Sequence, residues 1–324
     1  MHTPDRNCLL ALILAASFAT TPSRADTGPA FLTAWGSAGS GASQFNFAHL
    51  LDVAPSGDVY VADLLNSRVQ RFANTGSFIQ QWGTYGTGAG QFHQATAIAV
   101  APNGDVYVSG DDRVQRFSFD GTFETMWGST GAGPGQFASP IGIAVDPTGF
   151  VYVTDWMNHR VQKFTADGEF VTQWGSDGSA PGQFSTPLGI AAGAGGTVVV
   201  CDGNNLVQVF SSDGALLSWW GGAGTGPGQF SFPGRPAFDP SGFMIVPDQG
   251  NSRIEVFRPD GTFVMEWGAA GAGFGMFNHP TCSALDAFGN LFVMDKDNSR
   301  VQKFAPVATP IAPRSWGRLK LLYR

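Results

Sequence analysis

Six Trp-Gly dipeptides recur along the chain, and this repeat restricts the fold more than any other feature. Successive tryptophans are 45 to 47 residues apart. They are Trp35, Trp82, Trp127, Trp174, Trp220 and Trp267. A glycine-rich stretch ending in Phe follows each one, at Phe45, Phe92, Phe137, Phe184, Phe230 and Phe277. A period of this length with several short strands in each unit is typical of propellers and related arrays.

Each unit contains four short segments rich in β-branched and aromatic residues, separated by turn residues such as Asp-Gly. In the third unit these segments are Gly142–Val145, Val151–Thr154, Arg160–Phe164 and Phe170–Trp174. Four antiparallel strands repeated six times favour a closed ring, because closure removes exposed sheet edges. The sequence therefore predicts an all-β fold, a six-bladed β-propeller of four-stranded antiparallel blades.

The two ends of the repeat predict how the ring closes. Phe31–Gly36 matches the fourth strand of a unit, although no first three strands precede it. The last unit stops at Phe304 after its third strand, so we expect the N-terminal strand to complete it. Trp316-Gly317 is a rival, but it lies 12 residues after Phe304, against 10 from Phe to Trp inside other units.

The third unit resembles the NHL repeat family. The matching residues are Val151–Asp155, Asn158 and Arg160–Phe164. The resemblance extends over about residues 31–304, the range over which the same pattern recurs. It implies a propeller that serves as a platform for protein or RNA, as a sensor or, occasionally, as an enzyme.

The ends of the chain predict three regions. Residues 1–25 resemble a secretory signal peptide, with Arg6, an apolar run and Ser23-Arg24-Ala25 before the cleavage point. Residues 26–304 form the propeller, and residues 305–324 are a Pro-rich spacer and a basic tail. We therefore expect a monomer in the periplasm, on the cell surface or outside the cell, with no spanning segment.

The tail offers a separate contact surface. Ser315–Arg324 mixes Trp316, Leu319, Leu322 and Tyr323 with cations. Such a segment suits peripheral docking to an anionic membrane or to a sorting receptor. The alternative is an end without a function.

Charge argues against nucleic acid as a partner. Residues 26–313 contain 12 Lys and Arg against 24 Asp and Glu. An acidic body repels the phosphate backbone that dominates nucleic-acid affinity. The two cysteines of this region, Cys201 and Cys282, are separated by a whole blade, so we expect no disulfide between them.

A repeated set of Asp, Asn and Arg occupies the hairpin between the second and third strands of most units. Examples are Asp155, Asn158 and Arg160. Residues that recur in nearly every blade are more consistent with turn chemistry than with a ligand site. Function is better sought where one unit departs from the rest.

Four departures fall near the start of the innermost strands, at the mouth of the predicted channel. They are His49, Asp52, Arg235 and Cys282. Asp52 stands where every other unit has Ala. These side chains could converge on one small pocket. The alternative is drift in a repeat, with Asp52 hydrogen-bonded locally.

A second set of departures is apolar. Leu65, Trp156 and Met157 stand in hairpins on the same predicted face as His49. Exposed Trp and Leu on a rigid scaffold are typical interface anchors. The alternative is that they fold over a blade edge and cover the core.

One enzymatic relative of the fold can be compared directly. Peptidylglycine amidating lyases resemble NHL propellers, and that resemblance would imply zinc held by three His at the start of first strands. Here only His49 occupies such a position, which is too few for a zinc site. The sequence thus predicts no metal, no cofactor and a non-catalytic platform for protein, peptide or glycan. The alternative is a lyase or hydrolase at the channel mouth.

Overall fold

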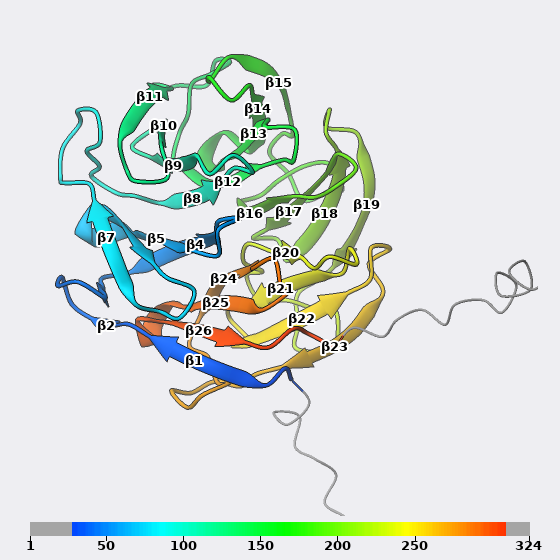
Figure 1. The fold of residues 1–324 in the computed structure, drawn as a ribbon. Coiled ribbons are helices and arrows are strands. Elements are labelled where there is room, and N and C mark those ends of the chain that lie inside the picture. The colour runs from blue at the N-terminus through cyan, green and yellow to red at the C-terminus, as the bar shows by residue number, and fades with distance from the viewer. Residues whose placement is uncertain (1–27, 309–324) are drawn as a thin grey trace, which may run out of the picture.

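Six four-stranded antiparallel sheets surround a central axis in the computed structural model, which describes residues 28–308 (Figure 1). Each sheet is one blade, and its strands run in sequence order from the axis to the rim in the first five blades. The predicted all-β six-bladed propeller is confirmed. The predicted signal peptide at residues 1–25, and all but the first four residues of the predicted spacer and tail at 305–324, lie outside the described residues.

The first three blades are built from consecutive strands. Blade one contains β4 (Ala48–Val53), β5 (Val59–Asp63), β6 (Arg68–Phe72) and β7 (Phe78–Trp82). Blade two contains β8 (Ala97–Val100), β9 (Val106–Gly110), β10 (Arg113–Phe117) and β11 (Phe123–Trp127). Blade three contains β12 (Pro140–Val145), β13 (Val151–Asp155), β14 (Arg160–Phe164) and β15 (Phe170–Trp174).

The other three blades complete the ring. Blade four contains β16 (Pro187–Ala192), β17 (Thr197–Asp202), β18 (Leu206–Ser211) and β19 (Leu216–Gly221). Blade five contains β20 (Ala237–Phe238), β21 (Met244–Asp248), β22 (Arg253–Phe257) and β23 (Phe263–Trp267). Blade six contains β24 (Pro280–Leu285), β25 (Leu291–Asp295), β26 (Arg300–Phe304) and β1 (Phe31–Trp35).

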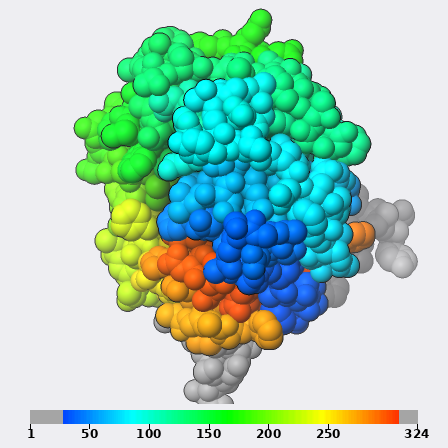
Figure 2. Space-filling model, turned by 90° about the vertical axis from the view of Figure 1, so that its left-hand side faces the viewer, coloured from blue at the N-terminus to red at the C-terminus, as the bar shows by residue number. Residues whose placement is uncertain are grey.

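The ring closes through the N-terminal strand, as the sequence predicts. β1 pairs antiparallel with β26, with Phe31 opposite Phe304 and Trp35 opposite Val301. Figure 2 shows the N-terminal residues in blue directly against the orange-red residues of the last blade. The outermost strand of blade six therefore comes from the opposite end of the chain to its other three strands.

Neighbouring blades are joined by contacts between a tryptophan and a phenylalanine. The Trp that ends the fourth strand of one blade packs on the Phe that ends the third strand of the next. Ring centroids are 5.9 Å apart for Trp82 and Phe117, and 5.9 Å apart for Trp35 and Phe72. The same contact occurs at all six blade junctions. Each contact buries large aromatic faces between two blades.

The tryptophan also explains the glycine in the turn between the third and fourth strands of blades one to five. Gly76, in the turn after β6, has a φ of +89°, and a Cβ there would approach Trp35 to 2.6 Å. Any other side chain would both strain the backbone and displace the ring. The turn glycine and the tryptophan of the preceding blade are therefore one packing unit.

The hairpins between second and third strands carry short 3₁₀ turns in three blades. These are η2 (Leu64–Asn66), η3 (Trp156–Asn158) and η4 (Lys296–Asn298). The repeated Asp and Arg form buried ion pairs across the hairpin, at 2.8 Å between Arg160 Nε and Asp155 Oδ2. The Arg160 guanidinium also donates to the carbonyl oxygens of Ala132, Gly133 and Gln136 in the preceding glycine-rich loop. The local structural role inferred for this motif is confirmed.

Glycine-rich loops complete the hairpin face. In the first of them a short parallel pair joins β2 (Ser37–Ala38) to β3 (Gln44–Phe45). The Asn66 side chain donates to the carbonyl oxygen of Gly39, which fastens hairpin and loop together. We call this the hairpin face; the opposite side, which carries the turns between first and second strands, is the turn face. Among the described residues, no helix has the length and apolar character for a membrane crossing.

Removal of β1 tests the closure. Deleting Phe31–Gly36 leaves β26 as an open edge and takes Trp35 away from Phe72, so we expect a loss of more than about 3 kcal/mol of stability, with aggregation. Thermal unfolding with light scattering measures both. The control is Leu32→Ser on the same strand, where the side chain is 49% exposed and the expected change is below about 0.5 kcal/mol. A deleted protein as stable as the control would show that β1 is not needed for closure.

Candidate functional site

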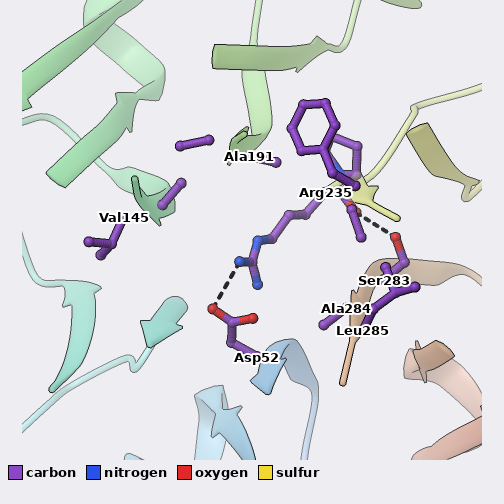
Figure 3. Close-up of a pocket in the computed structure, with 12 residues that line it drawn as sticks. Asp52, Val145, Ala191, Arg235, Ser283, Ala284 and Leu285 are labelled. Atoms are coloured by element: carbon purple, nitrogen blue, oxygen red, sulfur yellow. Dashed lines mark hydrogen bonds and ion pairs between the residues drawn. The ribbon is translucent and has the colours of Figure 1, made fainter. Parts of the chain in front are cut away.

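The innermost strands leave a small cavity on the propeller axis because most of them place alanine there. Ala99, Ala144, Ala191, Ala237 and Ala284 occupy the position of Asp52 in the other blades. The cavity has a volume of about 170 Å³, and its polar side chains are Asp52, Arg235 and Ser283 (Figure 3). A ring of methyl groups interrupted at one place by a carboxylate thus forms the wall of the channel.

Arg235 reaches this cavity because the innermost strand of blade five is irregular. Pro233 and Pro236 remove two backbone donors, and β20 is reduced to Ala237–Phe238. Blade six supports the segment instead. The Arg235 N–H donates to the carbonyl oxygen of Thr281 at 2.9 Å, and the Ser283 N–H donates to the Arg235 carbonyl oxygen at 3.1 Å. The backbone of Arg235 is therefore fixed, and its side chain crosses the channel.

Arg235 and Asp52 form an ion pair across the channel (Figure 3). Arg235 Nη2 lies 3.1 Å from Asp52 Oδ2, and the two side chains are 8% and 16% exposed. Arg235 Nη1 also donates to the carbonyl oxygen of Leu51 at 2.7 Å. The contact joins blade five to blade one through the axis, so these residues, distant in sequence, do come together.

The oxygens of Asp52 have further partners. Oδ1 accepts the N–H of Val53 and Oδ2 accepts the N–H of Val100 in blade two, both at 2.9 Å. The Arg235 Nε–H, in contrast, is buried with no hydrogen-bond partner among the described residues.

Cys282 lies behind the ion pair and outside the cavity lining. Its side chain is fully buried, and its Sγ accepts the N–H of Leu51 at 3.1 Å. Burial raises the pKa of the thiol to about 11. The neutral thiol is a packing contact between blades six and one. Cys201 is also buried, and neither cysteine is paired.

His49 lies nearer the hairpin face than the ion pair and does not line the cavity. Its Nδ1 donates to the carbonyl oxygen of Thr96, and its own carbonyl oxygen accepts the hydroxyl of Thr281. Burial, with a smaller contribution from Lys296, lowers the pKa of the imidazole to about 4. At neutral pH the ring is therefore uncharged and bridges the inner strands of blades one and two.

The apolar hairpin residues are on the surface. Leu65 is 51% exposed, Trp156 39% and Met157 63%. Their backbones are held, since the Trp156 and Met157 N–H groups donate to the carbonyl oxygens of Ser139 and Ala138. None of the three side chains belongs to a hydrophobic core cluster of the described residues.

Two further aromatic residues join them, which the sequence comparison overlooked. Phe47 and Phe232 each stand two residues after the repeated Phe, in blades one and five, and are 46% and 56% exposed. Both have positive φ, near +57°. The equivalent residues of blades three and four are the polar Ser139 and Thr186. Comparing that single position across the units would have identified them.

Comparison with known proteins supports the fold and a repeat type. Residues 137–164 match the NHL repeat. The chain is a six-bladed propeller that carries an NHL repeat. In sequence, none of the curated proteins matches this propeller. Among the described residues, no group of three or more His, Cys, Asp and Glu is arranged to hold a metal ion.

Solved structures with low identity share the fold. A structural genomics protein of unknown function from Bacteroides thetaiotaomicron is 17% identical, with a TM-score of 0.62 over 86% of this chain and 75% of its own. A streptogramin B lyase is 14% identical, with a TM-score of 0.57 over 87% and 94%. An inactive His-to-Ala variant of virginiamycin B lyase from Staphylococcus aureus, with quinupristin, is 15% identical, with a TM-score of 0.58 over 84% and 82%. At these identities the likeness concerns the propeller alone.

The ion pair on the axis predicts an energetic coupling between blades one and five. Arg235→Met leaves the Asp52 carboxylate half-buried without its cation, and we expect a cost of about 2 kcal/mol. Asp52→Ala leaves the Arg235 cation without its anion, whereas the double variant leaves neither charge. The double variant should therefore be more stable than the sum of the two single changes predicts, by about 1–2 kcal/mol. Urea unfolding of the four proteins measures the coupling. Additive effects would show that the pair carries no net interaction.

The neutral His49 ring predicts acid sensitivity. Its pKa falls from 6.5 when unfolded to about 4 when folded. Between these values the unfolded chain binds the extra proton, so the His49 contribution to stability is present above pH 6.5 and lost as pH falls toward 4. His49→Gln retains a donor for Thr96 and should flatten this part of the profile. Comparing urea unfolding of both proteins at neutral pH and near pH 5 isolates the effect; parallel profiles would contradict it.

Proposed function

We propose that this protein is a non-catalytic binding platform that engages a protein or peptide through its hairpin face. The observation that carries the proposal is the group of exposed apolar side chains on that face, Phe47, Leu65, Trp156, Met157 and Phe232. They extend from 3₁₀ turns and loop ends whose backbones are fixed by hydrogen bonds. Rigid aromatic anchors lose little conformational entropy on binding, which favours interface use.

The chemistry of the axial site supports binding rather than catalysis. Both oxygens of Asp52 already accept backbone N–H groups, and one also faces Arg235. A carboxylate with these partners is poorly suited to take a proton from a substrate. The cavity of about 170 Å³ is also smaller than typical small-molecule sites. We assign the pair to tying the blades together.

The partner is proposed to be a protein or peptide of the cell envelope or the extracellular medium. The location rests on the predicted secretory signal peptide at residues 1–25. The excess of acidic over basic residues in residues 26–313 disfavours nucleic acid as the partner. An acidic platform favours a partner whose contact surface is neutral or basic. Glycan is the other ligand class for which exposed aromatic rings are suited.

A double substitution on the hairpin face tests the proposal. Trp156→Ser with Leu65→Ser removes two anchors that cover no core, so we expect nearly unchanged thermal stability and a loss of capture of about tenfold or more. Capture of envelope and medium proteins by the immobilised propeller, followed by mass spectrometry, measures it.

The control is Leu32→Ser on the rim strand β1, which should capture as the unaltered protein does. Undiminished capture by the double variant would remove the hairpin face from binding. A large loss of thermal stability would instead place the two side chains in the core.

A further inference from the structure

Four blades carry an aromatic residue on the second strand opposite a cation on the third. The pairs are Tyr60 with Arg71, Tyr107 with Arg116, Tyr152 with Lys163, and Phe292 with Lys303. The Lys163 Nζ lies 5.6 Å from the centre of the Tyr152 ring, and the Lys303 Nζ lies 5.0 Å from that of Phe292. We call this arrangement the ring–cation pair.

Each ring–cation pair fills the space toward the following blade on the turn face. The Tyr60 hydroxyl donates to the carbonyl oxygen of Phe119 in the next blade at 2.9 Å. Arg116 Nη1 lies 2.9 Å from Asp167, and Lys163 Nζ lies 3.4 Å from Asp213, each in the turn after the third strand of the next blade. The ring supplies apolar contact, and the cation meets oxygens of the neighbouring turn.

Blades four and five lack the pair. Blade four has Val199 opposite Val209, and blade five has Ile245 opposite Val256. Beside blade five, Val307 packs in the same cluster as Ile245 and Val256 and is only 8% exposed, so the chain itself fills the space. Beside blade four no such segment is present among the described residues, and a cavity of about 420 Å³ lies there.

This cavity opens on the turn face between blades four and five. Its wall includes Val209, Leu217, Phe238, Met244 and Pro259. Val199 and Val209 belong to the cluster that contains Met244, so the apolar floor is continuous with the core. At about 420 Å³ the volume falls in the range of small-molecule sites.

Charge at the cavity is mainly acidic. Asp239 lines it, and Asp260 follows the lining residue Pro259. Asp260 stands in the turn at the position equivalent to Asp213, which receives Lys163 in the preceding junction. Arg258 is the neighbouring cation, and its guanidinium carbon lies 5.6 Å from the centre of the Phe243 ring.

We propose that the cavity between blades four and five binds a compact aromatic amine, whose ring and ammonium take the places of the missing ring–cation pair. The apolar floor accepts the ring. Asp260, in the turn after the third strand of blade five, receives the cation, as Asp213 of blade four receives Lys163. The site is on the opposite face from the hairpin platform, so each can fail without the other.

The test uses 2-phenylethylamine as probe, with ethylamine and toluene as its two halves. Isothermal titration and methyl chemical shifts of Val209 and Met244 follow binding. We expect the probe to bind about tenfold more tightly than ethylamine or toluene and to shift both methyl resonances. Equal affinity for probe and ethylamine, or shifts that avoid these methyl groups, would overturn the proposal.

A variant that fills the cavity gives the second arm. Val199→Tyr with Val209→Lys restores the ring–cation pair of blade three and should weaken probe binding about tenfold or more. The control is Leu32→Ser on the rim strand β1, which should bind the probe unchanged. If the double variant fails to fold, the methyl shifts of the unaltered protein still decide. Unchanged probe affinity in a folded double variant would contradict the proposal.

Discussion

The contact between a tryptophan of one blade and a phenylalanine of the next determines how the propeller is assembled. An isolated four-stranded sheet of this size cannot bury its two faces, and each blade depends on its neighbours for that. Trp82 covers Phe117, Trp127 covers Phe164, and the series continues until Trp35 covers Phe72. The turn glycines belong to the same contact, since Gly76 leaves room for Trp35. No other side chains would fill this contact between blades equally well. The same tryptophan, phenylalanine and glycine therefore recur in the units, and the repeat is visible in the sequence.

The residues that recur were predictable for this physical reason. β14 and β15 lie where the pattern places them, and β1 closes the ring against β26. The first strand of blade three begins at Pro140, two residues before the predicted start, because Pro140 pairs with Asp155 beyond a bulge in the strand. The alternation of residue types along a strand does not indicate where a bulge occurs, so the start of this strand could not be predicted from the sequence.

The candidate sites were less predictable because they depend on contacts between units. Asp52 and Arg235 each stand out within their own unit, and their position on the innermost strands predicted a common pocket, but the sequence does not show which of the four departures pair with each other. His49 and Cys282 stand out equally, but one bridges blades one and two and the other is buried behind the channel wall. The cavity beside Val209 depends on a pair of positions on two strands. The absence of the ring–cation pair from blade four becomes visible only when the pairing of its second and third strands is known.

Closure by β1 has a consequence for the order of folding and for the position of the chain ends. The strand made first must wait for β26, the strand made last, so blade six can be completed only after synthesis of the whole propeller. Contacts between such distant segments are slow to form, because the loop entropy is lost before the pairing is gained. Once formed, the pairing sets Phe31 opposite Phe304. A circular permutant that joins these ends and opens a glycine-rich loop elsewhere would keep all blade contacts but bring the last blade together early.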